Sequence, residues 1–132
     1  MTYQADCGLV SAGPFAGRVI VVAGDGDRLD PITSTLLEAG AIVAVVTHTS
    51  SAAAAQAWFR VDPADPDVWN RVVPHVEQRL GPIDAAVTTT EIHALVRDLL
   101  EPDMRRRGHG GVLDVDAAGN VEEAVRTLAT LL

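Results

Sequence analysis

The sequence contains no lysine, one tyrosine and one cysteine in 132 residues. The tyrosine, Tyr3, lies near the N-terminus, so a mechanism in which a tyrosine donates a proton and a lysine lowers its pKa has no residues to use. Cys7 stands alone, which excludes an internal disulfide, and its polar surroundings argue against a catalytic thiol. Two common kinds of catalytic centre are therefore disfavoured.

Positive charge is also scarce. The chain has 18 acidic and 10 basic residues and a formal charge of −8, which opposes nucleic-acid phosphates and anionic membrane surfaces. Its apolar runs are far shorter than the roughly 20 residues of a membrane helix, and no basic region opens the chain. We therefore expect a cytoplasmic protein that binds neither nucleic acid nor membranes. The basic run at 105–107 is expected at the solvated end of a helix.

Size and composition favour one folded domain with a single core. Residues 1–16 mix Gly, Ser, Pro and polar residues without a period, which predicts a flexible N-terminal tail. Order is expected to begin near Phe15, and the domain is expected to cover residues 17–132.

Two β-branched apolar runs, 19–23 and 42–46, are typical of strands buried in a parallel sheet. Between them, Asp30 and Pro31 predict a helix start, with the aspartate as N-cap and the proline as first helical residue. Gly40 is expected as the C′ residue of that helix. The three elements form a β-α-β unit, which predicts parallel strands and a right-handed crossover.

The alternation continues to the end of the chain. We expect a short helix over 50–56, a strand over 57–61, a helix over 66–80, a strand over 83–87, a helix over 91–107, a strand over 111–115 and a helix over 121–132. The predicted class is α/β, a Rossmann-like doubly wound, mostly parallel sheet of about five strands with helices on both faces. Trp58 and Trp69 are expected to pack in or against the core. The terminal pair Leu131 and Leu132 is expected to exceed what one face can bury, which favours association.

Several segments resemble the short-chain dehydrogenase/reductase family between about Phe15 and Asp116. They are Phe-Ala-Gly-Arg-Val at 15–19, Leu-Glu-Ala-Gly-Ala at 37–41, Gly-Pro-Ile-Asp at 81–84 and, most specifically, Pro-Asp-Met-Arg-Arg-Arg-Gly-His-Gly at 102–110. The resemblance implies a Rossmann fold, oxidoreductase ancestry and NAD(P) as the cofactor, if any is bound. It also implies that Asp62 stands where the family contacts adenine, and that Gly24, Gly26 and Thr88 line the residual cofactor cleft.

The family's glycine-rich loop, Thr-Gly-x-x-x-Gly-x-Gly, is altered here. Residues 23–30 read Ala-Gly-Asp-Gly-Asp-Arg-Leu-Asp, so two of the three glycines are replaced. Those glycines let the backbone approach a pyrophosphate that binds the N–H groups of the following helix. Asp25 and Asp27 add negative charge at that place, and Asp30 is expected to cap the helix itself. We expect dinucleotide affinity to be largely lost and no cofactor to be bound.

The catalytic motifs of the family are also missing. Thr88-Thr89-Thr90-Glu91 stands in place of Asn-Asn-Ala-Gly, so a glutamate replaces a glycine at the cofactor floor. The following helix is shortened, no serine follows the fifth strand, and no Tyr-x-x-x-Lys segment is present. The resemblance therefore implies a truncated, degenerate member, and we assign no catalytic residue.

Metal and signalling sites are weighed against simpler interpretations. Asp25, Asp27 and Asp30 lack the spacing and the bidentate glutamate of a calcium loop, so helix capping and solvated acids are favoured. A phosphate-receiver domain would need a lysine at its switch position. The four histidines, which are His48, His75, His93 and His109, form no i, i+4 pair, so no zinc ligand is assigned.

Several functional hypotheses remain open at this stage. The leading one is a non-catalytic domain that acts through protein association, as a homodimer or as the partner of an intact reductase. A nucleotide or small-molecule sensor using Asp62, a weak oxidoreductase and a decayed gene product are alternatives. An unrelated enzyme centred on residues 88–90 and His93, with Glu91 or Asp98 as acid–base partner of the histidine, is disfavoured because no oriented base is visible.

Overall fold

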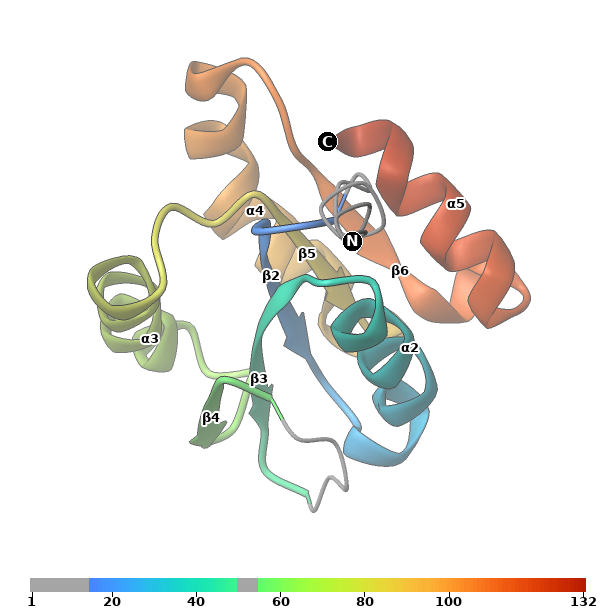
Figure 1. The fold of residues 1–132 in the computed structure, drawn as a ribbon. Coiled ribbons are helices and arrows are strands. Elements are labelled where there is room, and N and C mark those ends of the chain that lie inside the picture. Colours follow the sequence, from blue (N-terminus) through green and yellow to red (C-terminus); the bar gives the residue numbers. More distant parts are fainter. Residues whose placement is uncertain (1–14, 50–54) are drawn as a thin grey trace.

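The computed structural model describes residues 15–49 and 55–132, which alternate between strands and helices (Figure 1). The elements in chain order are β2 (Val19–Ala23), α2 (Gly26–Glu38), β3 (Ile42–Thr47), β4 (Ala57–Arg60), α3 (Pro66–Arg79), β5 (Ala85–Thr88), α4 (Thr90–Arg107), β6 (Val112–Asp114), the 3-10 helix η1 (Val115–Ala118) and α5 (Val121–Leu131). Each of the predicted strands and each helix from residue 66 onward is present, with ends that differ by one or two residues.

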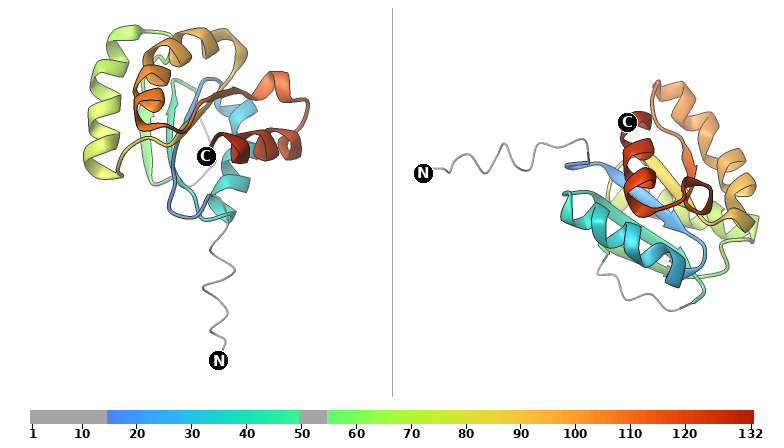
Figure 2. Two further views of the ribbon diagram at one scale, coloured as in Figure 1. Left: turned by 90° about the horizontal axis from the view of Figure 1, so that it is seen from above. Right: turned by 90° about the vertical axis from the view of Figure 1, so that its right-hand side faces the viewer.

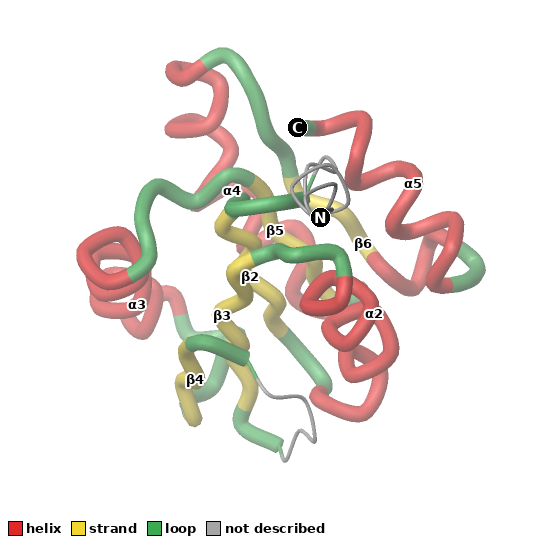
Figure 3. Tube along the Cα trace, viewed as in Figure 1, coloured by secondary structure: helices red, strands yellow, loops and turns green. Residues whose placement is uncertain are grey.

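The strands form one parallel sheet in the order β4-β3-β2-β5-β6 (Figure 3). The central strands β2 and β5 are buried along their whole length because both faces are covered by helices, as their apolar composition requires. The chain moves outward in one direction from β2 to β4, then returns to the other side of β2 as β5. The predicted Rossmann-like α/β fold is therefore confirmed.

Helices cover both faces of the sheet: α3 and α4 lie on one side, α2 and α5 on the other (Figure 2). Alternate residues of β2 point to opposite faces, as the pleat of a strand dictates. Val19, Val21 and Ala23 pack with the α3 and α4 side chains, while Ile20 and Val22 pack with those of α2 and α5. The core consequently has two halves separated by the sheet.

The start of α2 differs from the prediction. The helix begins at Gly26, and the N-cap is Asp25, whose carboxylate accepts the N–H of Asp27 at 3.0 Å. Asp30 and Pro31 lie inside the helix, because the chain turns into α2 only two residues after β2 ends. The predicted C′ residue Gly40 is confirmed by its φ of +89°.

Two other local predictions are wrong. Trp69 is buried, with its indole N–H on the carbonyl of Pro63 at 2.9 Å, but Trp58 is 56% exposed because its strand is an edge of the sheet. Leu131 and Leu132 are half-buried and pack with the α2 and α5 core, so they add little free apolar surface.

Parts of two predictions fall outside the described residues. Most of the expected helix over 50–56 lies there, and Gln56 is not helical, since its N–H bonds the carbonyl of Val43 at 3.0 Å. Residues 1–14 of the expected tail, with Tyr3 and Cys7, also lie there, whereas Phe15 is buried in the core. Within the described ranges, no helix is both long enough and apolar enough to cross a bilayer.

Candidate functional site

The carboxyl ends of the five strands meet at one edge of the sheet, because all the strands are parallel. Ligands of open α/β sheets bind at this edge, at the point where the chain reverses its direction through the sheet. Here that point lies between β2 and β5. The segments beside it are Gly24–Gly26, Thr88–Thr90 and Asp114–Asp116, at the carboxyl ends of β2, β5 and β6. They form the candidate site, which we call the switch-point crevice after the place where ligands of such sheets bind.

Two N–H groups in the first turn of α2 are already engaged by side chains of the chain itself. The N–H of Gly26 donates to Oγ1 of Thr49 at 2.9 Å, and the N–H of Asp27 donates to the carboxylate of Asp25 at 3.0 Å. In a dinucleotide-binding domain, the N–H groups of this helix face the pyrophosphate. Side chains of the chain itself therefore occupy donors that a phosphate would use.

Arg28 extends from this turn to the other side of the crevice. Its guanidinium binds both carboxylate oxygens of Glu91, at 2.7 and 2.8 Å, and one oxygen of Asp116, at 2.6 Å. A longer ion pair, at 3.6 Å, joins it to Asp25. One arginine thus links α2, α4 and η1, and the three carboxylates around it leave the crevice negatively charged.

The protonation of this cluster follows from its contacts. The pKa of the Glu91 carboxyl lies below its usual value, first because it accepts a hydrogen bond from Thr89 at 2.6 Å and then because of Arg28. The pKa of Arg28 is raised, mainly by its hydrogen bond to Glu91 and by the charge of Asp116. Both groups are therefore ionised at neutral pH.

The start of α4 is held by the segment after β6. The N–H of Thr90 donates to Asp116 at 3.0 Å, and the hydroxyl of Thr90 donates to Asp114 at 3.0 Å. Carboxylates near a helix N-terminus are stabilised by its dipole. This second helix N-terminus is therefore also covered by acidic side chains.

Thr88 and His93 come together, with Oγ1 of the threonine 3.1 Å from Nδ1 of the histidine. Thr88 is fully buried, so a substrate cannot reach its hydroxyl. The acids considered as partners of His93 have other contacts: Glu91 binds Arg28, and Asp98 forms an ion pair with Arg97 at 3.5 Å. The pair is therefore a structural contact and lacks the arrangement of a nucleophile with its base.

The cofactor-binding candidates of the sequence divide into two groups. Gly24, Gly26 and Thr88 lie at the switch-point crevice, since they end or follow the adjacent strands β2 and β5. Asp62 follows the edge strand β4, which β3 separates from β2, and its carboxylate accepts the N–H of Ala64 at 2.9 Å. That contact stabilises a local turn after β4.

The aspartates at positions 25, 27 and 30 belong to the first turns of α2, and Asp25 caps this helix. Across the part of the chain that the structure describes, no three His, Cys, Asp or Glu side chains are arranged to hold a metal ion. Sequence reasoning missed Arg28 and Asp116. The signal at Arg28 was a lone base within a run of three aspartates, which indicates an ion-pair centre but not its distant partners.

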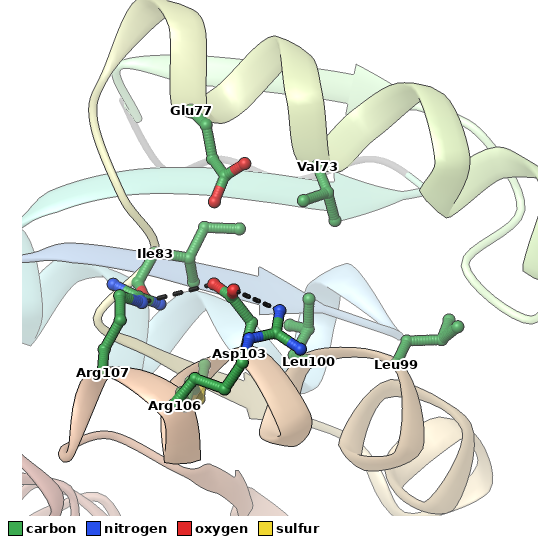
Figure 4. A pocket seen from close by; sticks show the side chains of 9 residues that line it. Val73, Glu77, Ile83, Leu99, Leu100, Asp103, Arg106 and Arg107 are labelled. Carbon is green, nitrogen blue, oxygen red and sulfur yellow. Dashed lines mark hydrogen bonds and ion pairs between the residues drawn. The ribbon is translucent and has the colours of Figure 1, made fainter.

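A second concave feature lies between α3 and α4 (Figure 4). It has a volume of about 250 Å³, and its apolar lining includes Ile83, Leu100 and Met104. Glu77 borders it on α3, while Asp103 on the α4 side is paired with Arg106 at 2.7 Å. The hydrogen bond from Arg106 holds the pKa of Asp103 below its usual value. This groove is continuous with apolar surface around Leu99, which is 39% exposed.

No protein-family model and no curated protein matches the sequence, but solved structures match the fold. The aldohexose dehydrogenase of Thermoplasma acidophilum superposes with a TM-score of 0.56 at 16% identity, over 88% of this chain and 56% of its own. A short-chain dehydrogenase/reductase from Serratia marcescens gives 0.54 at 20% identity, over 70% of this chain and 51% of its own. A short chain dehydrogenase from Bacillus anthracis gives 0.50 at 15% identity, over 58% and 35%.

These likenesses establish the fold, which is the fold of short-chain dehydrogenases. The chain spans about half or less of the length of these structures. The resemblance found in the sequence is confirmed at the level of the fold.

Proposed function

We propose that this chain is a non-catalytic domain of short-chain dehydrogenase ancestry that acts through contacts with other protein chains. The observation that carries the proposal is the ion pair between Arg28 and Glu91, in which one guanidinium nitrogen, Nη2, contacts both carboxylate oxygens across the switch-point crevice. A dinucleotide would bring its pyrophosphate to this place, where it meets an excess of carboxylates. Its charge would have to displace Glu91 or Asp116 from Arg28.

The chemistry of the residues supports the same conclusion. The 132 residues contain no lysine, and Thr88, the threonine beside His93, is buried. Proton transfer to a carbonyl substrate in the reductase manner needs a tyrosine beside a lysine, and the described residues contain neither. The exposed apolar side chains Trp58 and Leu99 offer surface for protein contacts instead.

Isothermal calorimetry with NADH and NADPH tests whether the switch-point crevice excludes dinucleotides. We expect no binding at micromolar ligand and no turnover of a carbonyl substrate. The double variant Glu91→Gln, Asp116→Asn removes two carboxylates while keeping Arg28, so it should bind adenine dinucleotides more tightly than the wild type. Micromolar binding by the wild type would favour a nucleotide sensor, and turnover would favour an oxidoreductase; either result contradicts the proposal.

A double variant that binds as weakly as the wild type would show that the ion pairs are not what closes the crevice. Circular dichroism and thermal unfolding of both proteins would verify that the variant is folded. Light scattering on the same samples gives the mass of the particle, which is the first measurement of association.

A further inference from the structure

Strand β4 is one edge of the sheet and carries the most exposed large apolar side chain among the described residues, Trp58, at 56%. Exposed apolar edge strands tend to pair with other chains, and proteins usually protect them with charge or proline. In β4, Trp58 and Arg60 are exposed and alternate with the half-buried Ala57 and Phe59. The tryptophan and the arginine therefore stand on one face of the strand.

The hydrogen bonds of β3 determine which of its residues face β4. The carbonyl of Val46 accepts the N–H of Gly24, on the β2 side of the strand. On the β4 side, the carbonyl of Val43 accepts the N–H of Gln56, and the N–H of Val43 donates to Oε1 of the Gln56 side chain. Successive residues of a strand direct their backbone groups to opposite sides. Val45, two residues after Val43, therefore faces β4.

The register then decides which residues of β4 face outward. Val45 is aligned with Trp58, so in a parallel ladder its backbone groups bond the flanking residues Ala57 and Phe59. Trp58 and Arg60 consequently direct their N–H and carbonyl groups away from the sheet. The outer edge of β4 thus presents backbone donors and acceptors at the same two residues that carry the exposed side chains.

We infer that two copies of this chain pair antiparallel through the outer edges of their β4 strands. Pairing Trp58 of one copy with Arg60 of the other lets each pair exchange both of its N–H···O bonds. The two-fold axis then passes between the two Phe59 residues. This inference rests on the proposed association function and names the surface and the partner.

The side chains of this register favour a second copy over an unrelated strand. Each indole lies across from the guanidinium of the other copy, which gives a cation–π contact twice by symmetry. Arg60 has no ion-pair partner within the described residues and is free to make it. The two arginines are not opposite each other, so like charges do not clash. A two-fold contact of this kind closes on itself and does not propagate into fibres.

Light scattering of the full chain over a range of concentrations tests the inference. We expect a dimer whose dissociation constant rises about tenfold or more in Trp58→Ser and in Arg60→Glu. The matched control is Leu99→Ser, which removes the other exposed apolar side chain, on α4, and should leave the mass unchanged. Trp69 is 2% exposed, so a red shift of tryptophan emission on dilution would report the exposure of Trp58.

A pair of variants separates backbone pairing from side-chain contact. Arg60→Pro and Arg60→Ala both lose the guanidinium, but only the proline also loses the outward N–H. Because that N–H takes no part in the ladder with β3, both variants should fold and give the same circular dichroism. We expect Arg60→Pro to weaken the dimer more than Arg60→Ala, and equal effects would contradict strand pairing.

Three further outcomes would overturn the inference. A dimer that persists in Trp58→Ser and dissociates in Leu99→Ser would place the interface on α4 and leave the association function standing. A monomer at every concentration would exclude the second copy and leave this edge to a strand of another protein. A dimer unaffected by any of these variants would exclude β4. The proposed function fails by a different measurement, the dinucleotide titration, which none of these results determines.

Discussion

The hydroxyl of Thr89 occupies the space beside Gly24 that a side chain would need. A Cβ built on Gly24 would lie 2.1 Å from Oγ1 of Thr89, and the φ of Gly24 is +132°, which other residues rarely adopt. The two residues follow β2 and β5, so their contact closes the junction between the central strands. Packing and backbone conformation together therefore require a glycine at position 24, which is also a cofactor-binding candidate in the sequence.

Replacing Gly24 with alanine should therefore lower the free energy of unfolding by about 2–4 kcal/mol, because steric overlap and backbone strain add. Denaturant unfolding measures this loss of free energy. Gly17→Ala is the matched control, since Gly17 also has a positive φ, +73°, but no atom within 4 Å of an added Cβ. The Gly17→Ala substitution should lower the free energy of unfolding by about 1–2 kcal/mol. Adding Thr89→Ala to Gly24→Ala should recover part of the loss; no recovery would show that the overlap is not responsible.

The central strands and most helices were predictable because their signals are local. β2 and β3 consist of β-branched residues except for one alanine in each, and α3 starts at Pro66 after an aspartate that caps it. The predicted start of α2 was wrong because the segment contains two aspartates that can each cap a helix. Asp30 with Pro31 is the stronger local pattern, but Asp25 begins the helix because the turn after β2 is short.

The site was predictable only where the sequence itself carries the chemistry. The acidic loop at 23–30 and Glu91, which replaces a glycine at the cofactor floor, indicated a crevice whose negative charge repels phosphate. Arg28 could not be assigned its role, because its partners Glu91 and Asp116 lie 63 and 88 residues further along the chain. Contacts of that separation depend on the assembled sheet. The exposure of Trp58 likewise depends on its strand being an edge.

Pro31 offers a direct test of where α2 begins. A proline in the first turn costs nothing, but one in the helix interior removes a hydrogen bond and crowds the preceding turn. Since Pro31 lies inside the helix, Pro31→Ala should raise the free energy of unfolding by about 1–3 kcal/mol. Pro66→Ala at the first residue of α3 is the control and should bring no gain. A destabilised Pro31→Ala protein would instead support a helix start at Asp30.

The Arg28–Glu91 contact should show a measurable coupling energy. A double-mutant cycle with Arg28→Gln and Glu91→Gln should give about 0.5–1 kcal/mol, since Nη2 of Arg28 contacts both carboxylate oxygens but the pair is half exposed. The coupling should shrink in 1 M salt, where the Debye length is about 3 Å. The Arg126–Glu123 pair on α5 is the comparison, and as an exposed contact within one helix it should give about 0.3–0.5 kcal/mol. Equal coupling energies in the two cycles would show that Arg28 does not hold the two sides of the crevice together.

The same contact predicts how stability depends on pH. The folded-state pKa of Glu91 lies below its usual 4.5, because Thr89 donates to the carboxylate and Arg28 pairs with it. A depressed pKa stabilises the fold above the unfolded-state pKa, and this contribution is lost as the pH falls through the folded-state value. Because the Glu91 side chain is half exposed and screened by solvent, wild type should exceed Glu91→Gln in unfolding free energy at pH 7 by at most about 1 kcal/mol. The difference should shrink as the pH falls through the folded-state pKa of Glu91.

Urea unfolding at several pH values between 7 and 2 would measure that difference. The pKa of Asp103 is also lowered, mainly because its carboxylate accepts a hydrogen bond from Arg106. Asp103 therefore contributes to the loss of stability in acid of both the wild type and Glu91→Gln. Asp103→Asn therefore serves as the control, because it should remove a separate part of the pH dependence and leave the Glu91 part intact. A gap between wild type and Glu91→Gln that stays constant with pH would mean that Glu91 acts through packing, and the ionic closure of the crevice would lose its support.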